Sequence, residues 1–103
     1  MNKDAELIHF PSGKKIKLLS FISFLENTLK EKILKLDFDD TTNSILFISK
    51  HYVVELRMTF EAYFLYLYIK REKLEFVYVV SDSNITRVKR KFARKFKEEI
   101  QNA

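Results

Sequence analysis

Between residues 34 and 80, apolar side chains recur largely at every second position, which is the period of a β-strand and not of a helix. Breaks interrupt the pattern at residues 40–43, 50–51, 60–61 and 70–73. Breaks this short favour tight turns between neighbouring antiparallel strands. The sequence therefore predicts a five-stranded antiparallel meander over about residues 34–80.

The register of this meander follows from its turns. If each turn is as short as its break allows, four apolar pairs face each other: Phe38–Ile45, Phe47–Val54, Leu56–Leu65 and Leu67–Phe76. A one-residue slip would turn every side chain to the other face, so the agreement of four turns supports the register. One face then carries no charge and is predicted to pack on at least one helix. Its members are Leu36, Phe38, Ile45, Phe47, Tyr52, Val54, Leu56, Met58, Tyr63, Leu65, Leu67, Ile69, Leu74, Phe76, Tyr78 and Val80.

The second face of the sheet is mixed, with an aromatic row at its centre. The row is Phe64, Tyr66 and Tyr68, and the register puts Arg57 across from Phe64. Aromatic rings flanked by cations stack bases in several proteins that bind single strands. These four residues are therefore candidates for a stacking or interaction face.

Two predicted neighbours weaken the stacking interpretation. The register puts Glu55 across from Tyr66 and Glu75 across from Tyr68, where negative charge would repel phosphate. The alternatives are that a helix of the same chain covers the aromatic row, or that the row mediates self-association.

The ends of the chain complete a small α+β domain spanning residues 1–103. Residues 7–10 and 15–18 flank Pro11-Ser12-Gly13-Lys14 and predict an N-terminal hairpin. A helix is predicted over about residues 21–33, with Ser20 or Ser23 as its N-cap. A second helix is predicted over about residues 83–101, with Asp82 or Ser83 as its N-cap.

The predicted C-terminal helix concentrates the charge of the chain. Residues 83–103 hold seven Lys and Arg against two Glu, which accounts for the entire net charge of +5. An apolar stripe of Ile85, Val88, Phe92, Phe96 and Ile100 is predicted to dock on the domain. The cations fall largely on the opposite side and are candidates for phosphate binding: Arg87, Arg90, Lys91, Arg94, Lys95 and Lys97. The alternatives are a solvated face paired with acids (Arg94–Glu98, Lys95–Glu99), an acidic protein partner or an anionic membrane surface.

Catalytic and metal-binding patterns are weak. His9 and His51 have no partner nearby in the sequence, and Cys is absent. Asp37, Asp39 and Asp40 lack the further oxygen ligands of a cation site and predict a solvated turn. We therefore expect no catalytic residues, no cofactor and no metal.

These observations favour a small non-catalytic nucleic-acid-binding or regulatory protein that contacts phosphates through its C-terminal helix. The alternative is a protein-interaction module, a homodimer or an inhibitor of a partner protein, that uses the aromatic face. The absence of Cys, of a signal-peptide pattern and of a long apolar run favours a cytoplasmic location and no transmembrane segment.

Overall fold

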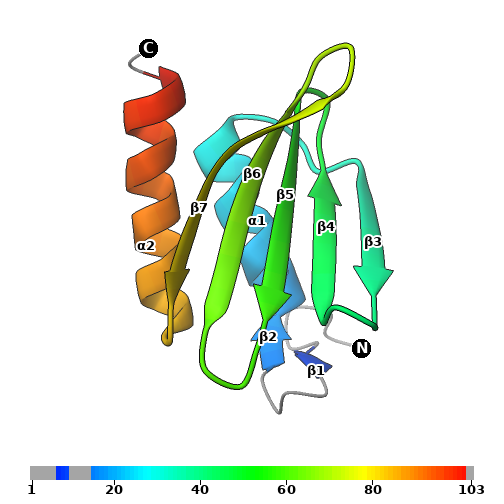
Figure 1. Cartoon of the computed structure of the whole chain (residues 1–103), viewed down its shortest axis with the longest axis vertical. Coiled ribbons are helices and arrows are strands. Elements are labelled where there is room, and N and C mark those ends of the chain that lie inside the picture. Colours follow the sequence, from blue (N-terminus) through cyan, green and yellow to red (C-terminus); the bar gives the residue numbers. More distant parts are fainter. Residues whose placement is uncertain (1–6, 10–14, 102–103) are drawn as a thin grey trace.

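The segment with apolar side chains at every second position forms one antiparallel sheet, in which the strands follow one another in chain order, β3-β4-β5-β6-β7. The computed structural model describes residues 7–9 and 15–101 (Figure 1). The elements are β1 (Leu7–His9), β2 (Lys15–Lys17), α1 (Leu18–Leu29), β3 (Lys35–Asp39), β4 (Ser44–Ile48), β5 (Tyr52–Met58), β6 (Tyr63–Lys70), β7 (Leu74–Asp82), α2 (Ile85–Phe96) and the π-helical η2 (Lys97–Gln101). The predicted α+β class and the five-stranded meander are confirmed.

Both helices pack on the same face of the sheet. Phe21 and Leu25 of α1 join one core cluster with Phe92 and Phe96 of α2 and with the uncharged sheet face, represented by Leu65. Figure 1 shows α1 behind the sheet and α2 beside β7, with no helix in front of the strands. We call the opposite surface the open face, because no described element covers it.

Three of the four predicted strand pairings are confirmed. Phe38 pairs with Ile45, Phe47 with Val54 and Leu56 with Leu65. Each of these turns is as tight as the break in the pattern allows, so the alternation of side chains carries through from β3 to β6.

The fourth pairing is wrong. Leu67 pairs with Tyr78 and Tyr68 pairs with Phe76, so Val77 is the extra residue of a β-bulge. The β6–β7 turn is also one residue longer than the shortest possible, because Lys70 pairs with Leu74. The longer turn and the bulge each shift the register by one residue, and two shifts return a side chain to its predicted face. Tyr78, which lies beyond both, therefore stays in the core.

The residues between the turn and the bulge are shifted by the longer turn but not by the bulge. Their side chains therefore lie on the face of the sheet opposite to the predicted one. Leu74 and Phe76 were predicted in the core, but they are 52% and 56% exposed, and Phe76 lies against the rings of Tyr66 and Tyr68. Glu75 correspondingly leaves the open face and pairs with Ile69, a residue on the face that carries the core.

The first helix begins and ends earlier than predicted. It starts at Leu18, directly after β2, and its N-cap Lys17 makes no side-chain capping bond, so the predicted caps Ser20 and Ser23 are wrong. It ends at Leu29, and the left-handed conformation of the C-cap residue Lys30 (φ 61°) stops the helix there. Because α1 follows β2 with no residue between them, there is no room for a separate capping turn.

The N-terminal hairpin is confirmed by the antiparallel pairing of β1 with β2. Its predicted turn, Pro11-Ser12-Gly13-Lys14, lies outside the described residues. Among the described residues, no helix combines the length and apolar character needed to span a membrane.

Candidate nucleic-acid interface

Helix α2 has two different sides, as its sequence predicts. Val88, Phe92 and Phe96 are buried, and Ile85 and Ile100 are partly buried against the same core. Burial of each Phe stabilises the docked helix by about 1.5–3 kcal/mol. The position of the cations is therefore fixed by the apolar stripe on the other side of the helix.

The N-terminus of α2 is capped by neither of the two predicted residues, Asp82 or Ser83. Asn84 is the N-cap, and its side-chain oxygen accepts a hydrogen bond from the Arg87 backbone N–H at 3.0 Å. Asp82 instead accepts a bond from the Asn84 backbone N–H at 3.0 Å. This leaves the Asp82 carboxylate beside the first turns of the basic helix.

Three of the predicted phosphate-binding cations are paired within the chain. Asp82 pairs with Arg87 (2.9 Å) and with Lys91 (3.0 Å), while Lys95 pairs with Glu99 (3.1 Å), as predicted. Hydrogen bonds from Lys91, from the Asn84 backbone N–H and from Arg87 hold the pKa of Asp82 well below its usual range, against a smaller opposing effect of desolvation. These cations are therefore partly neutralised.

The other three form what we call the free-cation stripe: Arg90, Arg94 and Lys97. They are exposed, stand three to four residues apart on the side away from the core, and make no ion pair within the described part of the chain. The predicted Arg94–Glu98 pair is not among the ion pairs of residues 7–9 and 15–101. Positive charge on this stripe is available to an external anion.

The aromatic row lies uncovered on the open face. Phe64 and Tyr66 are half-buried with their rings stacked at 6.5 Å between centroids, and Phe76 extends the cluster at 6.3 Å from Tyr66 and 5.7 Å from Tyr68. Val79, which pairs with Tyr66, is 43% exposed. The bulge thus adds a fourth ring to the row of three predicted from the sequence.

Glu55 does lie across from Tyr66, as predicted, but its charge is not presented to solvent. The side chain is buried (7% exposed), and one carboxylate oxygen accepts bonds from Arg57 Nε (3.1 Å) and Nη2 (2.7 Å). The other oxygen accepts a bond from the Tyr68 hydroxyl at 3.3 Å. Arg57, which pairs with Phe64, also lies 5.1 Å from the Tyr66 ring centroid.

The three aspartates near the β3–β4 turn have local roles. Asp37 lies 3.7 Å from Lys35, and Asp39 accepts hydrogen bonds from the Thr41 hydroxyl and backbone N–H. The hydroxyl bond lowers the pKa of Asp39. Within residues 7–9 and 15–101, no group of three or more His, Asp or Glu side chains is placed to hold a metal ion.

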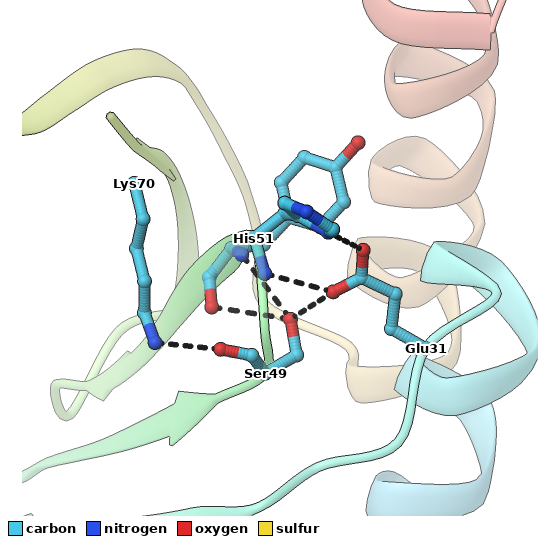
Figure 2. Close-up of polar contacts among 5 residues, drawn as sticks. Glu31, Ser49, His51 and Lys70 are labelled. Atoms are coloured by element: carbon cyan, nitrogen blue, oxygen red, sulfur yellow. Dashed lines mark hydrogen bonds and ion pairs between the residues drawn. The ribbon is translucent and has the colours of Figure 1, made fainter. Parts of the chain in front are cut away.

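His51 has a partner that the sequence did not indicate, because the two residues lie 20 positions apart. Its Nδ1 lies 2.6 Å from Glu31 Oε2, and its backbone N–H donates to Glu31 Oε1 at 3.0 Å. Figure 2 shows Glu31 reaching both His51 and Ser49, with Lys70 donating to the Ser49 carbonyl at 2.6 Å.

The Glu31, Ser49 and His51 cluster does not have the connectivity of a nucleophile and base. The buried Ser49 hydroxyl donates to the Glu31 carboxylate at 2.8 Å, and that carboxylate stands between the hydroxyl and the imidazole (Figure 2). A catalytic serine requires its hydroxyl to bond the base directly. The cluster instead fastens the α1–β3 connection to the β4–β5 turn.

A comparison of the chain with protein-family models, curated protein sequences and solved structures found no match in any of the three.

Proposed function

We propose that this protein is a small non-catalytic nucleic-acid-binding or regulatory protein, located in the cytoplasm, that contacts phosphates through α2. The observation that carries the proposal is the free-cation stripe. Arg90, Arg94 and Lys97 project from a helix whose other side is fixed in the core, and no carboxylate of the described chain neutralises them. Cations held in this way bind phosphate through Coulomb attraction and counterion release.

The direct test removes the stripe and leaves the fold intact. We expect the triple variant Arg90→Gln, Arg94→Gln, Lys97→Gln to bind labelled DNA or RNA at least about ten-fold more weakly at 50 mM salt. Fluorescence polarisation with single-stranded and duplex DNA and RNA measures the affinity. Because all three side chains are exposed, the melting temperature should stay close to that of the wild type.

A matched control removes the same charge elsewhere. Lys32, Lys50 and Lys73 are exposed residues in connections between elements, and their replacement by Gln also lowers the net charge by three. This variant should bind almost as tightly as the wild type. Equal losses in the two variants would mean that only net charge matters, and absence of wild-type binding to every nucleic acid would refute the proposal.

Affinity for nucleic acid is expected to rise when the Asp82 carboxylate, which pairs with two of the cations, is removed. Asp82→Asn eliminates the charge that neutralises Arg87 and Lys91, while its amide oxygen remains able to accept the Asn84 backbone N–H. The variant should bind nucleic acid more tightly than the wild type in the same assay. Weaker binding would argue that Asp82 orients the helix for binding.

A second candidate function is a protein-interaction module, either a homodimer or an inhibitor of a partner protein. The uncovered aromatic face favours it, since Phe76 and Val79 expose apolar surface that a second protein would bury. Sedimentation velocity over a range of protein concentrations tests the homodimer directly.

A further inference from the structure

Helix α2 lies beside the β7 edge of the sheet (Figure 1), and one member of the free-cation stripe, Arg94, lies at this edge. A hollow of about 540 Å³ lies there, lined by Val80 and Ser81 of β7, by Lys91, Arg94 and Lys95 of α2, and by one acid, Glu98 of η2. Lys91 Nζ donates to the Ser81 carbonyl at 2.9 Å, so the basic helix directly contacts the edge strand. Arg94 belongs both to this hollow and to the free-cation stripe.

The aromatic row begins one strand away from that hollow. Ser81 pairs with Phe64, and Phe64 pairs with Arg57, so these residues form one line across the sheet. Neighbouring strands are about 4.8 Å apart, which puts the first ring within about one strand spacing of the residue that Lys91 contacts. A flexible polyanion at the hollow therefore has rings directly beside it.

Neither acid expected to repel phosphate from this face does so. Glu55 is buried and neutralised by Arg57, and Glu75 lies on the other side of the strand, 3.5 Å from Arg71. The β6–β7 part of the open face carries a cluster of four rings, Phe64, Tyr66, Tyr68 and Phe76. The acids Asp37 and Asp39 of this face lie on β3, at the opposite edge of the sheet. Such a surface suits the flat, uncharged face of a nucleobase.

We propose that the open face and the free-cation stripe form one binding surface for single-stranded nucleic acid, with bases stacked on the rings and the phosphate backbone along the β7 edge. The inference rests on the proposed function and specifies its ligand. A duplex keeps its bases stacked inside and presents only phosphates and groove edges, so it reaches the cations but not the rings. A single strand reaches both.

The test separates rings from charges by using three probes: a labelled single-stranded oligonucleotide, its duplex, and inorganic polyphosphate, which has charge but no bases. Tyr66→Ala and Phe76→Ala should each weaken binding of the single strand about ten-fold. Neither should change binding of polyphosphate or of the duplex. Tyr66→Phe keeps the ring and should bind the single strand as the wild type does.

Leu74→Ala is the matched control, because Leu74 is also an exposed apolar residue of β7 but has no ring. It should leave affinity for the single strand unchanged, and circular dichroism melts should confirm that all variants are folded. Loss of affinity in this control equal to that of Phe76→Ala would contradict stacking.

The outcomes distinguish the inference from the proposed function. If the ring variants bind the single strand as the wild type does while the stripe variant does not, the inference is overturned and phosphate binding by α2 stands. If no probe binds the wild type, both fail. If the wild type sediments as a dimer, and Tyr66→Ala makes it a monomer with unchanged affinity for the single strand, the open face is an interface between two copies and the inference is overturned.

Discussion

Glu31 joins parts of the chain that are distant in sequence. Its carboxylate accepts the Ser49 hydroxyl and the His51 backbone N–H, and its second oxygen lies against the His51 ring (Figure 2). Partial burial raises the pKa of Glu31, but these hydrogen bonds outweigh that effect, so the pKa lies below its ordinary value. The folded state is therefore stabilised by ionised Glu31.

Glu31→Gln tests this contribution. A carboxyl group whose pKa is lowered by folding stabilises the folded state above its unfolded pKa, about 4.3, and this stabilisation is lost as pH falls through the lower folded pKa. At pH 7 we expect the variant to melt several degrees below the wild type. Melting curves from pH 7 to pH 3 should show the difference shrinking below about pH 4. Glu61→Gln, which changes an exposed turn residue, is the control. Its melting temperature should equal that of the wild type at both pH 7 and pH 3.

The β-bulge in β7 decides which rings reach the open face. Val77 has no partner in the β6–β7 ladder, whereas Phe76 pairs with Tyr68 and Tyr78 with Leu67. Deletion of Val77 would join these two pairs into a regular ladder without moving any other residue to the opposite face. The bulged residue is therefore the position of β7 at which a deletion removes no ladder pair.

We expect the deletion of Val77 to yield a folded protein with a lowered melting temperature. Deletion of Val79, by contrast, forces part of β7 to the opposite face, because it removes a paired residue, and should prevent cooperative unfolding. Circular dichroism and thermal melts of the two deletions provide the comparison. Equal stability of the two variants would contradict the position of the bulge.

Sequence patterns predicted those helices and strands in which apolar side chains recur at a regular spacing. The stripe from Ile85 to Ile100 and the alternation from β3 to β6 both follow from burial on one side, so periodicity was sufficient. Periodicity could not reveal the bulge at Val77, because a single inserted residue leaves the pattern on either side intact. Glu31 was missed for a different reason: its bonds to Ser49 and His51 span 18 and 20 residues, and such contacts have no local signal.

The predicted phosphate-binding residues show the same limit. Composition located all seven cations in α2 and its extension, but it could not sort Arg87, which pairs with Asp82, from Arg90, which has no carboxylate partner in the described chain. That distinction depends on where β7 ends relative to the first turn of α2. Side-chain pairing of this kind is set by tertiary structure.

The net positive charge of the protein and its exposed aromatic rings lie near the same edge of the sheet, at β7. The net charge of +5 comes from the segment after β7, and the rings of the open face lie on the strands next to it. A protein that neutralises Z phosphates of a single strand shows a slope of about −0.7Z when log affinity is plotted against log salt concentration. The slope therefore counts the cations in contact with the ligand.

The triple variant Arg90→Gln, Arg94→Gln, Lys97→Gln should reduce the magnitude of this slope by about 2 for a single strand, because three contacts are lost. Tyr66→Ala should lower affinity by the same factor at every salt concentration and leave the slope unchanged, since stacking releases no counterion. Fluorescence polarisation from 50 to 200 mM salt measures both slopes. Two results would contradict this division of roles between rings and cations. One is a change in the salt-dependence slope of Tyr66→Ala, and the other is an unchanged slope in the triple variant.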